Sequence, residues 1–378
     1  MATLLQVLPA LDKGGVERGT VDLARFLVRE GHRAIVASAG GGLVHELEAA
    51  GATHLTFPLA SKNPLTIWKN AARLADAIQA HGIELVHARS RAPAWSAKLA
   101  ARRTGRPFVT TFHAVYGGHQ HRLKRRYNAV MAEGDRVIAI SDYVAQHVRE
   151  VYRVGPQVLR TIYRGVDVEE FDPARVDARR VRTLSERFGV PAGKKVAILP
   201  GRVTRIKGHM LVTEAVALME RDDFVVLFVG PDTAGGGYTV ELRERIKAKG
   251  LGEKIRFVGA CDDMAAAIAL SDVVLAPSVG PEAFGRVSVE AQAMGKPVIV
   301  TDMGGLGETL LPASTGWLVP AEDPKELAWA LDLALSMPAE AGQRLKERAR
   351  HWVMDNFTAD RMCRQTLAVY EELLKGRP

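Results

Sequence analysis

The chain has few cysteines and no long apolar run. These two features argue against a disulfide-rich or zinc-binding protein and against a membrane-spanning one. Only two cysteines occur in 378 residues, Cys261 and Cys363, far apart and without a CxxC or histidine partner at metal-ligand spacing. A disulfide or zinc framework therefore has no support, and we expect two buried, reduced thiols. No apolar stretch approaches the ~18 residues of a membrane-spanning helix. Strand-like residues begin at once, without the basic segment of a secretory signal, so we expect a cytoplasmic protein.

Motifs of two other ligand classes are also missing. The segment LDKGGVERG, after the first predicted strand, cannot be aligned with GxGxxG, which argues against a nicotinamide or flavin enzyme. No RNA-binding or helix-turn-helix signature is found, and few aromatic residues lie among the basic ones. A nucleic acid partner is therefore not expected.

The composition is that of a folded protein, and the length indicates more than one domain. Hydrophobic residues make up 47% of the chain and charged residues 25%, which is typical of globular domains. At ~150 residues per domain, a length of 378 residues predicts two domains.

The net charge of +8 is unevenly placed. No carboxylate occurs between Glu84 and Glu133, whereas basic residues are frequent in the region 89–126. Within it, HRLKRRYNAVM has helical spacing of its apolar residues, which are Leu123, Tyr127, Val130 and Met131. Such a surface attracts anionic lipid or polyphosphate. An anionic membrane surface and a merely solvated charged face are both open interpretations.

The same alternation of short apolar strands and amphipathic helices runs through both halves. Strands are expected at 4–8, 34–38, 54–57, 84–87, 108–111 and 136–140, then at 196–199, 224–229, 255–258, 273–276 and 298–301. Near-continuous apolar strands such as FVVLFVG are typical of sheets covered by helices on both faces. We therefore predict an α/β protein with two doubly wound, Rossmann-like domains that face each other across a cleft.

The polar, strand-free stretch at about 167–195 predicts the domain boundary. We assign residues 1–170 to an N-terminal, acceptor-side domain and residues 171–356 to a C-terminal domain. Parallel sheets bind ligands at the carboxyl ends of their strands, so functional residues should follow strands in both halves.

Candidate binding residues do follow strands. Gly14 and Gly15 let the main chain approach a ligand, and a helix begins next to them. Arg202 and Lys207 follow the first strand of the second half, where two cations suit a diphosphate. His113 follows the fifth strand; a lone histidine is more often structural, yet this one falls at the predicted cleft.

The strongest motif is PEAFGRVSVEAQAMGKP, with Glu282 and Glu290 eight positions apart. A helix is predicted over 286–294, and Gly285 stands where it begins. Its free N–H groups and positive dipole end favour an anion. Two carboxylates beside these donors suit a ligand that carries both hydroxyls and phosphates, such as a sugar diphosphate.

The motifs together resemble a known family. From GGVERGTVDLARFLVREGH through TFHAVYG, YRGVD, GRVTRIKG and PEAFGRVSVEAQAMGKPVIVTDMGGLGE to TGWLVPAEDP, the chain resembles the retaining glycosyltransferases of family 4, which have the two-domain GT-B fold. The resemblance covers almost the full length. It implies transfer of a sugar from a nucleotide-diphosphate donor with retention of the anomeric configuration. It also implies a closing C-terminal helix, here 358–375, so that residues 357–378 pack on the first domain.

The resemblance implies roles for the candidate residues. Glu290 is expected to bind the ribose hydroxyls and Glu282 the sugar, while Arg202 and Lys207 contact the phosphates. The backbone of Ala283, Phe284 and Gly285 is expected to contact the sugar hydroxyls. Gly15, which follows Gly14, is expected to contact the diphosphate. His113 is expected to contact the sugar or the acceptor.

Two residues depart from the family pattern. Arg164 in YRGVD stands where the family usually has asparagine, which suggests an acceptor contact, and Arg286 replaces a commonly aliphatic residue beside Gly285. No Asp-x-Asp motif precedes the donor loops, and the resemblance implies no metal, so we predict no metal ion and no cofactor beyond the donor substrate.

Three functions are compatible with these patterns. The basic region and the resemblance favour a glycosyltransferase at the inner face of the cytoplasmic membrane, acting on a lipid-linked or oligosaccharide acceptor in lipopolysaccharide core or cell-surface polysaccharide synthesis. The alternatives are a soluble GT-B enzyme, such as a sugar synthase or nucleotide-sugar epimerase, and a non-enzymatic sugar-binding receptor.

Overall fold

The structure is a computed structural model that describes residues 1–12, 14–117, 120–232 and 236–375. The chain forms two compact units. Unit 1 contains Met1–Gly165 together with Ala359–Pro378, and unit 2 contains Val166–Thr358. The division after Gly165 lies slightly before the expected boundary at 170, because the polar stretch that follows is built into unit 2.

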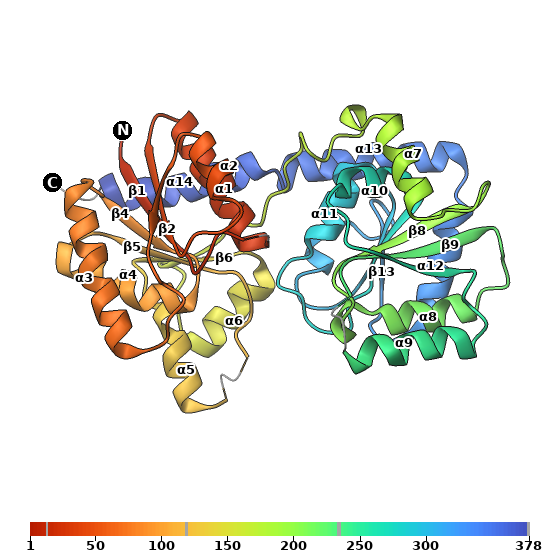
Figure 1. Ribbon diagram of the computed structural model, residues 1–378, viewed down its shortest axis with the longest axis horizontal. Coiled ribbons are helices and arrows are strands. Elements are labelled where there is room, and N and C mark those ends of the chain that lie inside the picture. Colours follow the sequence, from red (N-terminus) through yellow and green to blue (C-terminus); the bar gives the residue numbers. More distant parts are fainter. Residues whose placement is uncertain (13, 118–119, 233–235, 376–378) are drawn as a thin grey trace. The chain divides into compact units, whose positions relative to one another are not determined.

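Unit 1 alternates strands and helices along its sequence (Figure 1). Its strands are β1 (Thr3–Val7), β2 (Arg33–Ser38), β3 (Thr53–Thr56), β4 (Leu85–Ala88), β5 (Phe108–Phe112), β6 (Arg136–Ala139) and β7 (Leu159–Thr161). Its helices are α1 (Gly15–Arg29), α2 (Val44–Ala49), α3 (Pro64–Ala80), α4 (Arg91–Thr104), α5 (Arg122–Asn128), α6 (Asp142–Tyr152) and α14 (Ala359–Lys375), with a 3₁₀ turn at Ala129–Ala132.

Unit 2 repeats the same alternation (Figure 1). Its strands are β8 (Lys195–Pro200), β9 (Phe224–Val229), β10 (Ile255–Gly259), β11 (Val273–Ala276), β12 (Val298–Thr301) and β13 (Trp317–Val319). Its helices are α7 (Ala178–Arg187), α8 (His209–Ala217), α9 (Gly237–Ala248), α10 (Met264–Leu270), α11 (Arg286–Ala293), α12 (Pro324–Leu335) and α13 (Ala339–Asn356), with 3₁₀ turns at Pro173–Arg175, Arg205–Lys207 and Gly307–Thr309.

Each unit has one sheet, and the paired strands are parallel. The strand order is β3-β2-β1-β4-β5-β6-β7 in unit 1 and β10-β9-β8-β11-β12-β13 in unit 2. Both contain the order 3-2-1-4-5-6 of nucleotide-binding doubly wound sheets, so the predicted fold class is confirmed. In this topology the direction of winding reverses between the first and fourth strands, and ligands bind at the carboxyl ends there. Ligand sites are therefore expected at the carboxyl ends of β1 and β4 in unit 1, and of β8 and β11 in unit 2.

The central strands are largely buried because helices cover both faces. All six residues of β9 are buried, for example. In unit 1, α1 packs its Val21, Leu23 and Leu27 into a core that also includes Tyr370 of the C-terminal helix α14. The expected return of the last helix to the first domain is thereby confirmed, with its start at Ala359.

Two strands were not predicted, and one expected loop contains a helix. β7 and β13 have three residues each and lie at sheet edges, so their apolar runs are too short to be recognised. The stretch expected to separate the domains contains α7, which Asp177 caps by accepting a hydrogen bond from the Arg179 N–H. Leu184 is the buried residue of this strongly charged helix.

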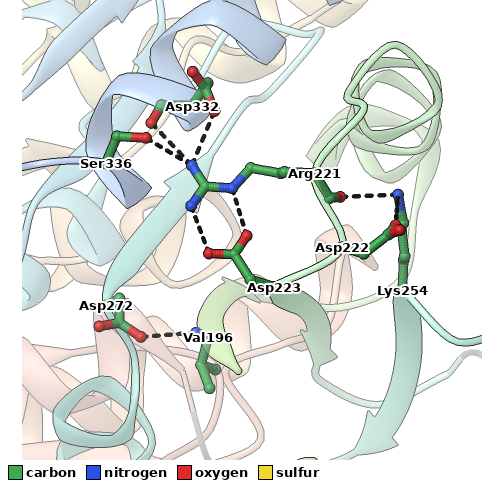
Figure 2. Close-up of polar contacts among 8 residues, drawn as sticks. All are labelled: Val196, Arg221, Asp222, Asp223, Lys254, Asp272, Asp332 and Ser336. Atoms are coloured by element: carbon green, nitrogen blue, oxygen red, sulfur yellow. Dashed lines mark hydrogen bonds and ion pairs between the residues drawn. The ribbon is translucent and has the colours of Figure 1, made fainter. Parts of the chain in front are cut away.

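Ion pairs hold the amino end of the unit 2 sheet together (Figure 2). The guanidinium of Arg221 donates to both carboxylate oxygens of Asp223, to Asp332 of α12 and to the hydroxyl of Ser336, which directly follows this helix. Asp272, just before β11, accepts from the Val196 N–H of β8 at 2.8 Å and pairs with Lys195 at 3.3 Å. This end carries structural contacts, in contrast to the carboxyl end described below.

The basic region 89–126 is only partly a surface. Arg89 and Lys98 are buried, and Lys98 pairs with Glu133. The predicted helical face is also wrong in one respect: Val130 and Met131 are buried, but Leu123 is 83% exposed. The helix ends at Asn128 and a 3₁₀ turn follows, which changes the direction in which the later side chains point. Residues 118–119 of this region lie outside the described residues.

Two further expectations concern cysteines and membrane spans. Both thiols are free; Cys363 is buried as expected, but Cys261 is only half-buried. In the described ranges, none of the helices combines the length and apolar character needed to cross a bilayer.

Candidate active site

In unit 2, three loops that follow the neighbouring strands β8, β11 and β12 are in contact. The loop 201–208 touches the turn after β11, since the Val279 N–H donates to the Ile206 carbonyl at 2.8 Å. Gly208 has φ +75°, and a Cβ there would overlap the Pro277 carbonyl oxygen. The loop after β12 approaches equally closely, because the Gly305 N–H donates to the Glu282 carbonyl at 2.7 Å. The main chains thus form one continuous wall at the switch point of the sheet.

Lys207 and Glu282 meet within this wall. The Lys207 ammonium lies 2.5 Å from Oε1 of Glu282, and the Ser278 hydroxyl donates to the same oxygen. Thr301, the last residue of β12, donates to the Ser278 carbonyl at 2.5 Å. Both charged side chains are largely shielded, with 31% and 19% of their surfaces exposed. Two of the predicted residues, 75 positions apart, are therefore held together beside a small hollow that Gly285 and Leu306 also line.

Helix α11, which carries Glu290, begins at this hollow, since Gly285 and Val287 line it. Gly285 precedes the helix, as predicted, and the helix ends at Ala293. Glu290 is buried, and its carboxylate accepts from the Arg286 guanidinium at 2.7 Å. Gln292 donates to the Thr309 carbonyl and to Ser288, which fixes the helix against the following loop. Arg286, whose role the sequence left open, is thus the partner of Glu290.

The other residues predicted for unit 2 differ in exposure. Arg202 is exposed, and within the described part of the chain no ion pair joins it to a carboxylate. Ala283 is half-buried, whereas Phe284 is buried against the ring of Phe357 at 5.6 Å between centroids. The Phe284 side chain therefore anchors the loop.

His209 is the first residue of α8 and directly follows the loop 201–208. Its burial predicts how the stability of the fold depends on pH. It is fully buried with its ring edge-on to Phe228, and burial lowers the pKa of its imidazole to about 4. Protonation below the unfolded pKa of ~6.5 therefore favours the unfolded chain, and stability falls as the pH drops from 6.5 toward 4.

We expect His209→Phe to remove this part of the acid sensitivity. Between pH 6 and pH 5 the variant should lose about 1 kcal/mol less unfolding free energy than the unmodified protein. Urea unfolding at a series of pH values measures the difference. Above pH 7 the unfolding free energies of the two proteins should change with pH in the same way. If the unfolding free energies of both proteins had the same slope between pH 6 and pH 5, His209 would titrate normally in the folded state.

In unit 1, the predicted residues lie at the ends of β1, β5 and β7. Gly14 is the N-cap of α1 in an extended conformation, and no side chain caps the helix. Arg164 is buried and donates to the carbonyl of Gly15 and to Nδ1 of His113, the latter at 3.3 Å. The structure thus brings Gly15, His113 and Arg164 together. Lys13, beside Gly14, lies outside the described residues.

The protonation state of His113 follows from these contacts. Burial, and then the positive charges of Arg89 and Arg164, hold the pKa of its imidazole well below the usual range. The ring is therefore neutral near pH 7. Because a guanidinium only donates hydrogen bonds, Nδ1 must accept, and the proton lies on Nε2. Nε2 is buried and has no partner within the described part of the chain.

Sequence reasoning missed two residues of these sites. Ser278 holds Glu282, and its position directly after Pro277 at the end of a strand was a usable signal. Arg89 directly follows β4, but was counted only as part of a basic surface; the structure buries it at 5% exposure. Its position after a central strand was the neglected signal.

Comparisons with known proteins agree with this architecture. The family profile described as Glycosyltransferase Family 4 matches residues 13–170, and that described as Glycosyl transferases group 1 matches residues 181–352. The crystal structure of a glycosyltransferase from Rickettsia africae is 38% identical, covers 100% of this chain and 99% of its own, and superposes with a TM-score of 0.92. The structure of Anabaena HepE with UDP-glucose superposes at 0.83, with 22% identity over 99% of this chain and 100% of its own.

A curated relative from Salinispora tropica, a D-inositol 3-phosphate glycosyltransferase, is 31% identical over 79% of this chain and 66% of its own length. The chain spans about two thirds of the length of the curated relatives of this kind. Two doubly wound parallel sheets of this strand order are the architecture of GT-B glycosyltransferase structures. The chain belongs to this glycosyltransferase family, of the group 1 and family 4 type.

Proposed function

We propose that the protein transfers a sugar from a nucleotide-diphosphate donor to an acceptor hydroxyl with retention of configuration and without a metal ion. The observation that carries the proposal is the contact of Lys207 with Glu282 at the switch point of unit 2, beside the start of α11, the helix that carries Glu290. Cations suit the diphosphate, and carboxylates suit the hydroxyls of sugar and ribose. HepE, named with UDP-glucose in its structure, has the same fold.

Each site residue has a proposed role. Glu290 binds the ribose hydroxyls, Glu282 binds the sugar, and the main chain of residues 283–285 binds sugar hydroxyls. Arg202 and Lys207 contact the phosphates, and Gly15 of unit 1 approaches the diphosphate. His113 and Arg164 contact the sugar or the acceptor.

The main catalytic effect is stabilisation of the departing diphosphate. Negative charge grows on this group as the glycosidic bond breaks, and fixed cations and amide dipoles stabilise it without reorganising. A double displacement would need two carboxylates ~5 to 5.5 Å apart around one bond. Glu290 is instead buried in a helix and paired with Arg286. The acceptor oxygen then attacks on the face from which the diphosphate leaves, and the diphosphate takes its proton.

We further propose an acceptor at a membrane surface, in lipopolysaccharide core or cell-surface polysaccharide synthesis. Supporting it, Arg122, Arg125, Arg126 and Arg153 surround a surface hollow beside the exposed Leu123. Cations around an exposed apolar side chain suit an anionic bilayer interface. Flotation with vesicles containing anionic lipid tests this; failure to bind favours a soluble sugar synthase or epimerase. A sucrose-phosphate synthase shares the fold at 22% identity.

The decisive experiment is a thermal-shift panel of UDP-, GDP- and ADP-sugars. A donor at 100 times its Kd stabilises the fold by ~2.7 kcal/mol, which raises the Tm by several degrees. Donor turnover that persists in EDTA is expected for metal-independent transfer. If none of the sugar nucleotides shifts the Tm, the proposed function is wrong.

Replacing Glu290 by alanine should weaken the affinity for the bound nucleotide about 10-fold, because charge-assisted hydrogen bonds to the ribose are lost. Isothermal titration with the nucleoside diphosphate identified by the panel measures the change. Glu340→Ala is the matched control, since it also removes an Arg–Glu pair four residues apart on a helix, with Arg344 at 3.9 Å. An unchanged Kd in Glu290→Ala would remove Glu290 from the donor site.

A further inference from the structure

Arg89 of unit 1 is a buried cation that no ion pair of the described residues neutralises. It directly follows β4, its N–H donates to the Val7 carbonyl of β1 at 2.9 Å, and its side chain is 5% exposed. Nε is buried without a hydrogen-bond partner, and within the described ranges no carboxylate forms an ion pair with the guanidinium. The charges of Asp22 and Glu17 of α1 act on it without an ion pair. Buried arginines are normally paired, because an unpaired buried charge is costly.

Two further polar groups face the same region. Arg164 is also 5% exposed and contacts His113, and the charges of both arginines act on the His113 imidazole. Among the described residues, the Nε2–H of His113 has no acceptor. We call Arg89, Arg164 and His113 the Arg89 cluster. It follows β4, β7 and β5, so it lies at the carboxyl edge of the sheet, on the side where ligands bind in this topology.

The chemistry of the Arg89 cluster is that of an anion site. A guanidinium presents parallel N–H donors that match the oxygens of a phosphate or carboxylate. The Nε2–H of His113 adds a neutral donor. An apolar or neutral ligand would leave the charge of Arg89 uncompensated, whereas an anion supplies the missing counter-ion.

We infer that the Arg89 cluster binds an anionic group, phosphate or carboxylate, carried by the acceptor. The inference rests on the proposed function and adds the substrate class: the acceptor is a charged sugar or sugar phosphate, and a neutral glycan is not a substrate. Unit 2 has its own cations for the donor diphosphate, Arg202 and Lys207, so the Arg89 cluster remains for a second anion.

The test compares anionic and neutral sugars in the presence of saturating UDP. Glucose 6-phosphate and glucuronate are the phosphate and carboxylate probes, and glucose is their neutral counterpart. We expect at least one anionic probe, used up to about 10 mM, to raise the Tm of the unmodified protein, with glucose inactive. Arg89→Gln should weaken that binding at least about 10-fold, the loss expected for one charge-assisted contact. Arg33→Gln, an exposed arginine at the amino end of β2, is the control and should bind normally.

A second readout does not need a ligand. If Arg89 lacks a counter-ion, Arg89→Gln breaks no ion pair, so its Tm without added anion should equal or exceed that of the unmodified protein. A fall of several degrees would mean that Arg89 has a structural partner and would overturn the inference.

The remaining outcomes are equally decisive. Equal binding of the anionic probes by Arg89→Gln, no binding of either probe, or equal binding of glucose overturns the inference. Competition between an anionic probe and UDP also overturns it, because the anion site would then belong to the donor diphosphate. Failure of UDP, GDP and ADP alike to bind counts against the proposed function, while anion binding by the Arg89 cluster is measured separately.

Discussion

Replacing Lys207 by alanine is expected to lower the turnover number about 100-fold or more. Loss of one preorganised donor to a developing negative charge typically costs a factor of 10² to 10³. Lys207 is preorganised because Glu282 holds its ammonium at 2.5 Å and because its loop packs on the turn after β11. In the variant, Ser278 still donates to Glu282, so the carboxylate keeps one of its partners. Steady-state kinetics with the donor found by the thermal-shift panel measures the effect.

The control is Lys195→Ala. Lys195 also joins β8 to the β11 side of the sheet, through Asp272 at 3.3 Å, but at the opposite, amino end of the strands. The two variants remove the same charge and the same kind of ion pair, so only a position-specific effect can separate them. Turnover in Lys195→Ala should be unchanged. If Lys207→Ala also kept the turnover number of the unmodified protein, Lys207 would have no part in the mechanism.

Replacing Gly208 by alanine should destabilise unit 2 by about 3 kcal/mol or more and lower its Tm by about 6 °C or more. Gly208 has φ +75°, which an L side chain rarely adopts, and a Cβ would overlap the Pro277 carbonyl oxygen. Relief requires the loop 201–208 to move away from the turn after β11. The same movement displaces Lys207 from Glu282, so turnover should fall as well. Differential scanning calorimetry measures the stability.

Gly250→Ala separates the two causes. Gly250, after α9, has φ +68°, but no atom lies within 4 Å of the position of a Cβ. This control variant therefore has the backbone strain without the close contact. Its free energy of unfolding should fall by about 1 kcal/mol. If both variants lost the same stability, the close contact between Gly208 and Pro277 would not contribute to the fold.

Much of the fold was predictable because it depends on local patterns. β9 is apolar along its whole length, and β1 and β8 are apolar except for Thr3, Gln6 and Lys195. The edge strands β7 and β13 were missed, since three residues do not establish a period. Pairing with a neighbouring strand is what makes such short segments strands, and pairing is not visible in the local sequence.

The sequence proposed residues for the candidate site, but it did not indicate the contacts among them. Glu282, Glu290 and Lys207 were candidates from motif and position. The sequence left the role of Arg286 open, although its spacing of four from Glu290 on a helix allows the pair that the structure contains. Arg89 was assigned to a solvated or membrane-facing surface, because a basic segment alone does not indicate which of its members the fold buries.

By itself, the sequence determined the alternation of strands and helices, the parallel sheets and the residue types at the strand ends, because periodicity and turn chemistry act over a few residues. The tertiary structure alone decided which groups meet: Lys207 with Glu282, and His87 of β4 with Tyr370 of α14 across 283 positions, at 2.6 Å. It also decided which charges lose their water, as Arg89 does. Burial and partnership depend on how distant segments pack, and these two properties determine the chemistry of a charged side chain.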